Sequence, residues 1–283
     1  MCGKTERTDP NGTIDEMRGK KVLVTGAGTG IGRGIALKFG EAGADVVLHY
    51  SSSSGAESAA RVICERGRKA IAVHGDFRTI EGARQTARAA EDFLGGVDIL
   101  INNAGITANA PFEDVTPEDF DTLFQVNLRA QFFLTQALLP EMSRRGKGIV
   151  VNLTSIHAYS GLTEHAVYAA TKAAIVSYTR VAALELIQKG IRMNAIAPGW
   201  IFVENHVSTF GEQFDFEAAA RGIPAGFIGT PSDVANLALF LACDASRYIV
   251  GQTIICDGGQ TSVMPLTGDF RGRRSEKWGS RYL

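Results

Sequence analysis

Short apolar runs along the chain alternate with longer stretches in which apolar residues recur every three or four positions. The short runs predict strands, and the longer periodicity predicts amphipathic helices between them. The predicted strands are 21–25, 45–49, 70–74, 97–101, 148–153, 191–196 and 252–256. The predicted helices are 31–40, 55–66, 79–94, 117–143, 165–188 and 231–242.

Strands that alternate with helices form βαβ units, whose crossovers are right-handed. We therefore expect an α/β fold with a doubly wound parallel sheet and helices on both faces. Ligands of such sheets bind at the carboxyl ends of the strands. The pattern predicts a single domain at 19–262, with a polar N-terminal tail at 1–18 and a C-terminal extension at 263–283.

A glycine-rich turn follows the first predicted strand. Gly26 and Gly30 lie between this strand and the helical pattern that begins at Ile31, and Gly32 lies in the first turn of that pattern. Such glycines permit a tight turn, bring the backbone close to a phosphate and let the helix pack against the strand. Free N–H groups at the helix N-terminus would then bind a diphosphate. The spacing differs from the Gly-x-Gly-x-x-Gly dinucleotide fingerprint, so a plain tight turn between strand and helix is the alternative.

Tyr168 and Lys172 are four residues apart in a predicted helix, so their side chains project from the same face. An ammonium group beside a phenol favours the phenolate, and we expect it to lower the pKa of Tyr168. A phenol with a lowered pKa can exchange a proton near neutral pH. Ser155 follows a predicted strand and lies thirteen positions upstream of Tyr168. Without other motifs, an exposed helix face would explain the Tyr–Lys pair equally well.

Five motifs together resemble the short-chain dehydrogenase/reductase family, in its compact single-domain branch. In chain order they are Thr25-Gly26-x-x-x-Gly30-Ile31-Gly32, Asn102-Asn103-Ala104-Gly105, Ser155, Tyr168-x-x-x-Lys172 and Pro198-Gly199. The resemblance runs from about Lys20 to Gly259 and includes sugar dehydrogenase-like and 3-oxoacyl reductase-like members. It implies a Rossmann-like fold and hydride transfer between a nicotinamide cofactor and a secondary alcohol or carbonyl.

The resemblance also implies four catalytic residues. Tyr168 would move the hydroxyl proton, and Ser155 would hydrogen-bond the same oxygen. Lys172 would hold the nicotinamide ribose, while Asn127 would hold a water that links Lys172 to solvent. A purely structural Asn127 is the alternative. Thr154 competes with Ser155 for the serine role, but the spacing to the tyrosine matches the family for Ser155.

A larger set of residues is implied to bind the cofactor. It comprises Gly26, Thr29, Gly30, Ile31, Gly32, Tyr50, Ser51, Ser52, Asp76, Phe77, Asn103, Ala104, Gly105, Tyr168, Lys172, Pro198, Gly199 and Ile201. By the resemblance, Asp76 accepts a hydrogen bond from the adenine amino group; a cap of a turn is its alternative. Asn103 would lie beside the adenosine, bond the backbone, or do both.

The choice between NADP(H) and NAD(H) depends on the end of the second predicted strand. NAD enzymes place an acid there that bonds the ribose 2′-hydroxyl. Here Tyr50 takes the position of the acid, and the following serines could donate to a 2′-phosphate. Thr29 stands where NADP enzymes often carry a basic residue. We expect NADP(H), with NAD(H) as the alternative.

Polar residues near the expected substrate site favour a sugar or polyol. The expected substrate contacts are Ser155, His157, Tyr168 and Trp200. Glu204, Asn205 and His206 add polar groups on the following loop, where Val203 replaces a common threonine. An ordinary surface lid is the alternative for this loop. Phe202 and Phe210 would suit an acyl chain, so a 3-oxoacyl-[acyl-carrier-protein] reductase is the competing enzyme.

Composition restricts the partners of the chain. It has 283 residues, a net charge of −1 and 45% hydrophobic residues, which makes no electrostatic case for nucleic acid or an anionic membrane. Neither a secretory signal nor an apolar run long enough to cross a membrane is recognised, and no metal-ligand cluster is apparent. The cysteines are well separated, at Cys2, Cys64, Cys243 and Cys256. This spacing suits reduced thiols in the cytoplasm.

The family resemblance further implies a homotetramer or homodimer. The helices at 117–143 and 165–188 would form its interface, and alanine pairs on the second helix would allow close packing. The C-terminal extension combines basic and aromatic residues, which predicts that it contacts a neighbouring subunit. A non-catalytic dinucleotide-binding regulator is a remote alternative, because the catalytic residue types are all present.

Overall fold

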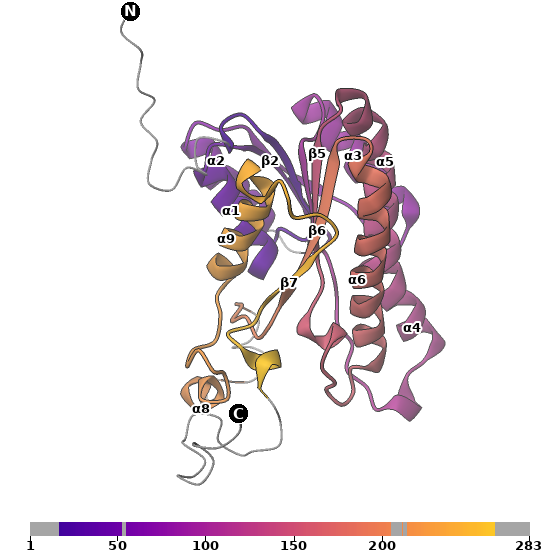
Figure 1. The fold of residues 1–283 in the computed structure, drawn as a ribbon, viewed down its shortest axis with the longest axis vertical. Coiled ribbons are helices and arrows are strands. Elements are labelled where there is room, and N and C mark those ends of the chain that lie inside the picture. The colour runs from indigo at the N-terminus through magenta and orange to yellow at the C-terminus, as the bar shows by residue number, and fades with distance from the viewer. Residues whose placement is uncertain (1–16, 53–54, 205–210, 212–213, 264–283) are drawn as a thin grey trace, which may run out of the picture.

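A computed structural model describes residues 17–52, 55–204, 211 and 214–263. Its centre is a seven-stranded parallel sheet with the strand order β3-β2-β1-β4-β5-β6-β7 (Figure 1). The strands are β1 (Lys21–Val24), β2 (Asp45–Tyr50), β3 (Ala70–His74), β4 (Ile99–Asn102), β5 (Gly148–Leu153), β6 (Ile191–Pro198) and β7 (Thr253–Cys256). The predicted fold class is therefore confirmed.

Helices cover both faces of the sheet (Figure 1). One face carries α1 (Gly30–Glu41), α2 (Gly55–Glu65) and α9 (Pro231–Ala242). The other carries α3 (Ile80–Leu94), α4 (Pro117–Phe124), α5 (Ala130–Arg145) and α6 (Ala166–Ile187). The short helix α8 (Phe216–Ala220) lies in the connection between β6 and α9. No described helix combines the length and apolar character needed to cross a bilayer.

Alternating residues of β1 supply two separate cores. Val22 and Val24 belong to the core shared with α1, α2 and α9, whereas Leu23 belongs to the core shared with α3 and α5. Because the sheet is buried on both faces, its strands read as unbroken apolar runs. Met17, in the predicted N-terminal tail, is also fully buried in the first core. The packed domain therefore includes at least this residue before position 19.

The sheet order reverses between β1 and β4. The chain builds outward from β1 through β2 to β3, then returns to place β4 on the other side of β1. Their register pairs Val22 with Ile99 and Val24 with Ile101. The loops that leave these two strands consequently diverge, and the crevice between them is where a doubly wound sheet binds its ligand.

One predicted helix is interrupted. The stretch 117–143 consists of α4, a π-helical segment (Gln125–Arg129) and α5. Asn127 is the buried residue of this π-helical segment, and its side chain bonds a neighbouring loop and α6. Single π-helical turns within α-helices often mark functional sites. The prediction of one continuous helix was wrong here, because one extra residue in a single turn hardly changes the spacing of apolar residues.

Candidate active site

The glycine turn joins β1 to α1 at the point where the sheet order reverses. Gly26 has a φ of 63°, and a Cβ atom there would lie 2.8 Å from the Ala104 Cα. A Cβ atom on Gly32 would lie 2.2 Å from the Gly26 carbonyl oxygen. Real side chains do not tolerate either approach, so packing requires both glycines.

Thr25 and Asn103 lock this turn to the loop after β4. The Thr25 Oγ1 accepts from the N–H groups of Asn103 at 2.9 Å and Ala104 at 3.0 Å. The Asn103 Nδ2 donates back to the carbonyl oxygens of Thr25 at 2.9 Å and Gly26 at 3.1 Å. The backbone role considered for Asn103 is thus present, and the residue also lines the cavity described below. Thr25 was quoted in the sequence motif but had no predicted role.

His49 supports the turn from β2, and sequence reasoning missed it. Its Nδ1 accepts from the Gly26 N–H at 3.2 Å, so its Nε2 carries the proton and donates to the Gly75 carbonyl at 3.0 Å. The ring stacks on Phe77 with centroids 3.8 Å apart. Burial lowers the pKa of His49 to about 4, so it is neutral near pH 7. The available signal was a polar residue within an otherwise apolar strand.

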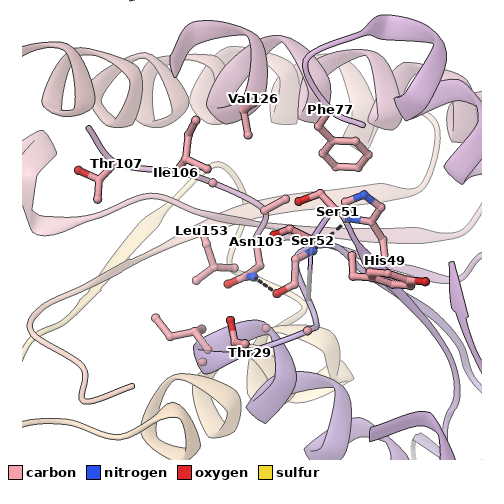
Figure 2. A pocket seen from close by; sticks show the side chains of 18 of the residues that line it. Thr29, His49, Ser51, Ser52, Phe77, Asn103, Ile106, Thr107, Val126 and Leu153 are labelled. Carbon is pink, nitrogen blue, oxygen red and sulfur yellow. Dashed lines mark hydrogen bonds between the residues drawn. The ribbon is translucent and has the colours of Figure 1, made fainter. Parts of the chain in front are cut away.

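A cavity of about 770 Å³ lies over the carboxyl ends of the central strands (Figure 2). Figure 2 shows Thr29 on one side, and Ile106, Thr107 and Val126 on the opposite side. All predicted cofactor residues except Gly199 and Ile201 line this cavity. Its volume lies within the range of small-molecule and cofactor sites. The glycine turn forms its floor, so the residues present fit an extended ligand that carries a diphosphate.

Gly199 and Ile201 pack the loop after β6 instead of lining the cavity. A Cβ atom on Gly199 would lie 2.4 Å from the Gln260 Oε1 and 2.6 Å from the Asp257 Cβ. Ile201 is buried and forms an isolated β-bridge with Gly229. In this structure Gly199 and Ile201 therefore determine the path of the loop after β6.

The far end of the cavity contains Asp76 and Arg78. The Arg78 Nε and Nη2 contact the Asp76 carboxylate at 3.0 and 2.9 Å, and the Arg78 N–H donates to it at 2.9 Å. Hydrogen bonding to Arg78 lowers the pKa of Asp76. The turn-capping role considered for Asp76 is therefore present. Arg78 lines the cavity as well, and sequence reasoning missed it.

Ser51 and Ser52 line the cavity beside Tyr50 at the end of β2. The Tyr50 hydroxyl lies 3.5 Å from the Glu57 Oε1, at the limit of a hydrogen bond. Glu57 is not among the residues that line the cavity. His74, on the neighbouring strand, contacts the Ser51 carbonyl through its Nε2 at 3.1 Å. This corner thus presents hydroxyl groups and an imidazole to the cavity.

Ser155, Tyr168 and Lys172 come together between the end of β5 and α6. The Ser155 Oγ accepts from the His157 N–H at 3.2 Å and is hydrogen-bonded to Tyr168. The Lys172 Nζ donates to the Leu153 carbonyl at 3.2 Å and lies over the Tyr168 ring, 5.4 Å from its centroid. The sequence spacing and the fold therefore bring together three of the four predicted catalytic side chains.

Thr154, the competitor of Ser155, is committed to the backbone. Its Oγ1 donates to the Lys172 carbonyl oxygen at 2.7 Å, and its side chain is buried. This bond ties the end of β5 to the turn of α6 that carries Lys172. Thr154 therefore positions the helix, whereas the Ser155 hydroxyl is bonded to Tyr168.

The expected lowering of the Tyr168 pKa is wrong for this structure. Burial raises the pKa of Tyr168, and the hydrogen bond to Ser155 opposes that effect. Burial also lowers the pKa of Lys172 to about 8. A buried environment disfavours both the phenolate and the ammonium. The Lys172 Nζ, still mostly protonated at pH 7, lies 5.4 Å from the centroid of the Tyr168 ring, and burial of the phenol has the larger effect on its pKa.

Asn127 has its side chain occupied by protein groups. Its Nδ2 donates to the Ile106 carbonyl at 2.9 Å and the Thr171 Oγ1 at 3.1 Å, and its Oδ1 accepts from the Ile106 N–H at 2.8 Å. A Cβ atom on Gly105 would lie 3.3 Å from the Asn127 Oδ1 and 3.4 Å from the Lys172 Nζ. Asn127 therefore holds the loop after β4 against α6, close to the lysine.

Two histidines border Tyr168. The rings of His157 and His165 stack at 4.9 Å, and His157 meets the Tyr168 ring edge-on at 5.5 Å. Burial and the neighbouring His165 lower the pKa of His157, whose buried Nδ1 has no hydrogen-bond partner within the described part of the chain. Sequence reasoning selected His157 but missed His165, although it precedes Tyr168 by three positions on the same helical side.

The loop after β6 carries Trp200 and Glu204, which contact different parts of the molecule. The Trp200 ring meets Phe214 edge-on at 5.9 Å, and the Trp200 backbone N–H donates to the Gln260 Oε1 at 2.8 Å. The Glu204 Oε2 accepts from the Gly30 N–H at 2.9 Å, so in this structure Glu204 contacts the glycine turn and not the substrate side. Asn205, His206, Phe210 and nearly all of the C-terminal extension lie outside the described residues.

Comparison with known proteins places the chain among nicotinamide-dependent enzymes. Residues 26–261 match the family model described as enoyl-(acyl carrier protein) reductase. The chain is 38% identical to 3beta-hydroxysteroid dehydrogenase 1 of Eggerthella lenta, over 87% of this chain and 95% of that protein. It is 37% identical to L-rhamnose 1-dehydrogenase (NAD(P)(+)) of Sphingomonas sp., over 86% of this chain and 96% of that protein.

A solved structure from Beutenbergia cavernae, described as an NAD(P)-dependent gluconate 5-dehydrogenase, has NADP bound at low occupancy. It superposes on this chain with a TM-score of 0.80 at 36% identity, and the match covers 87% of this chain and 98% of that one.

Proposed function

The chain belongs to the short-chain dehydrogenase/reductase family, and from that premise we propose an NAD(P)(H)-dependent oxidoreductase that acts on a secondary alcohol or its carbonyl counterpart, with a sugar or polyol as substrate. One observation carries this proposal: Tyr168 and Lys172 line a cavity built on a glycine turn, and Ser155 is hydrogen-bonded to Tyr168 beside it. That arrangement supplies a proton-transfer group next to a site shaped for a dinucleotide.

Each catalytic side chain has a defined task in this proposal. The bound nicotinamide cofactor supplies the hydride chemistry. Tyr168 donates its proton to the carbonyl oxygen during reduction, and burial, which raises the pKa of the phenol, keeps it in the protonated form that this step needs. Ser155 hydrogen-bonds the same oxygen and stabilises its developing charge. Lys172 holds the nicotinamide ribose. Asn127 anchors the loop after β4 beside Lys172, where a water would link the lysine to solvent.

NADP(H) is the proposed preference. The serines after β2 line the cavity, and the residue at the end of this strand is Tyr50 where NAD enzymes carry an acid. Hydroxyl groups can donate to a 2′-phosphate, whereas a carboxylate would repel it. The NADP bound in the gluconate dehydrogenase-like structure is in keeping with this choice.

A sugar or polyol is the proposed substrate class. His157 and His165 form a polar wall beside Tyr168, and these rings offer hydrogen-bonding nitrogens to hydroxyl groups. The relatives named for rhamnose and gluconate support the same class.

A 3-oxoacyl thioester reductase is the second candidate. It is favoured by the acyl-carrier-protein description of the matching family model and by exposed aromatic rings near the loop after β6. Phe202 is 36% exposed and Phe227 is 56% exposed, so both could receive an acyl chain.

The proposal is tested by following the absorbance of the reduced nicotinamide with aldoses, polyols, aldonates and a 3-oxoacyl thioester, each with NAD(H) and NADP(H). We expect turnover on a polyhydroxylated substrate, with a higher kcat/KM for the NADP(H) couple. Tyr168→Phe should lower kcat by about 10²- to 10⁴-fold, because it removes the proton-transfer group.

The matched control is Tyr159→Phe, which removes a phenol hydroxyl from a half-exposed position two residues after His157. Turnover confined to the thioester would select the second candidate. Turnover that survives Tyr168→Phe unchanged would contradict the proposed mechanism.

A homodimer or homotetramer through α5 and α6 is also proposed. Val181 and Leu184 on α6 are 57% and 66% exposed, and Phe132 on α5 is 42% exposed. The Phe132 and Tyr178 rings meet at 5.4 Å, so the two helices present one continuous apolar face. We also propose the reducing cytoplasm as the compartment, since Cys64, Cys243 and Cys256 carry free thiols.

A further inference from the structure

The segment after β6 lies directly on the glycine turn. The Glu204 Oε2 accepts from the Gly30 N–H at 2.9 Å, and its Oε1 lies 3.6 Å from the Arg33 guanidinium. The Val203 Cγ1 would be 3.0 Å from a Cβ atom on Gly30. A carboxylate from the loop after β6 thus occupies the start of α1.

This position has a chemical meaning. The first N–H groups of a helix are unpaired within the helix and carry the positive end of its dipole, so they attract anions. Here the nearby Arg33 adds a full positive charge. The contact partners of Glu204 are the groups that a glycine turn offers to a diphosphate. The carboxylate and a cofactor diphosphate therefore compete for the same place.

We propose that Glu204 is an internal competitor of the cofactor diphosphate, so that cofactor binding displaces the Glu204 carboxylate from the glycine turn. This inference rests on the proposed function, because it requires a diphosphate-bearing cofactor at the glycine turn. The bound cofactor and the Glu204 carboxylate therefore exclude one another at the glycine turn.

The geometry limits which part of the segment moves. The Phe202 N–H donates to the Gly229 carbonyl at 2.7 Å, and the Gly229 N–H donates to the Trp200 carbonyl at 3.1 Å. This pair of bonds fixes the chain through Phe202. The displaced part therefore begins at Val203, whose side chain must leave the space over Gly30 together with the Glu204 carboxylate.

The first test measures the Kd of NADPH and NADH by nicotinamide fluorescence in wild type, Glu204→Gln and Glu204→Ala. Removing the charge should tighten cofactor binding by about two- to fivefold, because the helix N-terminus no longer has to release a carboxylate. The alanine variant should bind at least as tightly as the glutamine variant. Glu217→Gln, an equal change at an exposed position on α8, should leave Kd unchanged.

The outcomes separate this inference from the proposed function. Wild-type binding with unchanged or weaker binding in both Glu204 variants overturns the competition and leaves the oxidoreductase standing. Failure of the wild type to bind either cofactor overturns both.

A second measurement examines the contact without cofactor. Hydrogen exchange of the peptide containing Gly30 should be faster in Glu204→Ala than in wild type or Glu217→Ala, because the Gly30 N–H loses its acceptor. Added NADP⁺ should protect this peptide in every variant. Equal exchange rates in all three cofactor-free proteins would show that Glu204 does not occupy the turn.

Discussion

Burial determines the protonation of the most important side chains at this site. Tyr168 and Lys172 lie in a pocket that penalises both the phenolate and the ammonium, so burial raises the pKa of the first and lowers that of the second to about 8. Burial also lowers the pKa of His49, to about 4, because its ring is enclosed by Phe77 and the loop after β3. Near neutral pH His49 and Tyr168 are therefore mainly uncharged, whereas Lys172, with a pKa of about 8, is still mostly protonated.

His49 should make stability depend on pH. Its folded pKa of about 4 lies below the usual 6.5, so between these values the unfolded chain binds more protons. Stability is therefore complete above about pH 6.5 and falls as pH decreases towards 4, by on the order of 3 kcal/mol for this group. Urea unfolding at several pH values measures the slope.

His49→Gln should flatten this slope, since glutamine does not titrate. His74→Gln is the control: His74 is exposed on the adjacent strand and makes only the smallest contribution to the lowered pKa of His49, so this variant should keep most of the wild-type slope. An unchanged slope in His49→Gln would mean that other groups cause the acid sensitivity.

At the scale of elements, the glycine turn is connected to three strands, of which β1 leads directly into it. Thr25 and Asn103 join it to β4, and His49 joins it to β2. The turn thus enters α1 at the switch point with its N–H groups directed by contacts on both sides. This arrangement preorganises the anion-binding end of α1 before any ligand arrives.

Gly32→Ala should disrupt that arrangement. Its Cβ atom would meet the Gly26 carbonyl oxygen at 2.2 Å, and neither backbone segment can yield easily. We expect a loss of about 1–3 kcal/mol, the usual cost of forcing an extra methyl group into a packed region. Thermal unfolding and cofactor titration would both report it.

Gly161→Ala provides the comparison, because a Cβ atom there meets nothing within 4 Å. It should change the free energy of unfolding by less than about 0.5 kcal/mol. Equal stabilities of the two variants would contradict the packing argument.

For the whole molecule, the sheet divides two tasks between its faces. The face covered by α1, α2 and α9 carries the helix that follows the glycine turn, and the face covered by α5 and α6 carries the helix that includes Lys172 (Figure 1). The exposed apolar side chains of α6 lie on the same helix as Tyr168 and Lys172. Association through this helix would therefore also stabilise the catalytic residues.

Leu184→Arg should weaken that association. Light scattering coupled to size-exclusion chromatography should show a dimer or tetramer for the wild type and a smaller species for the variant, because an interface core does not accept an unpaired charge. Leu162→Arg makes the same change at a residue that is 57% exposed outside α6 and should keep the wild-type mass. A monomeric wild type would contradict the proposal.

Local patterns determined much of this protein. Strand and helix positions follow from apolar periodicity, and the alternation of elements predicted the doubly wound sheet, because each βαβ unit is a nearly local structure. The spacing of Tyr168 and Lys172 placed both on one helix face, and the order of motifs indicated the family, which the comparisons confirm.

Only the tertiary structure decided the contacts between distant residues and the charges that burial permits. Glu204 and Gly30 are 174 positions apart, and no local periodicity connects them. The bond between His49 and Gly26, the stack of His157 on His165 and the raised pKa of Tyr168 likewise depend on which elements become neighbours. Hydrophobic patterning specifies which faces are buried, but packing in three dimensions sets the partner, the distance and the solvation of each polar group.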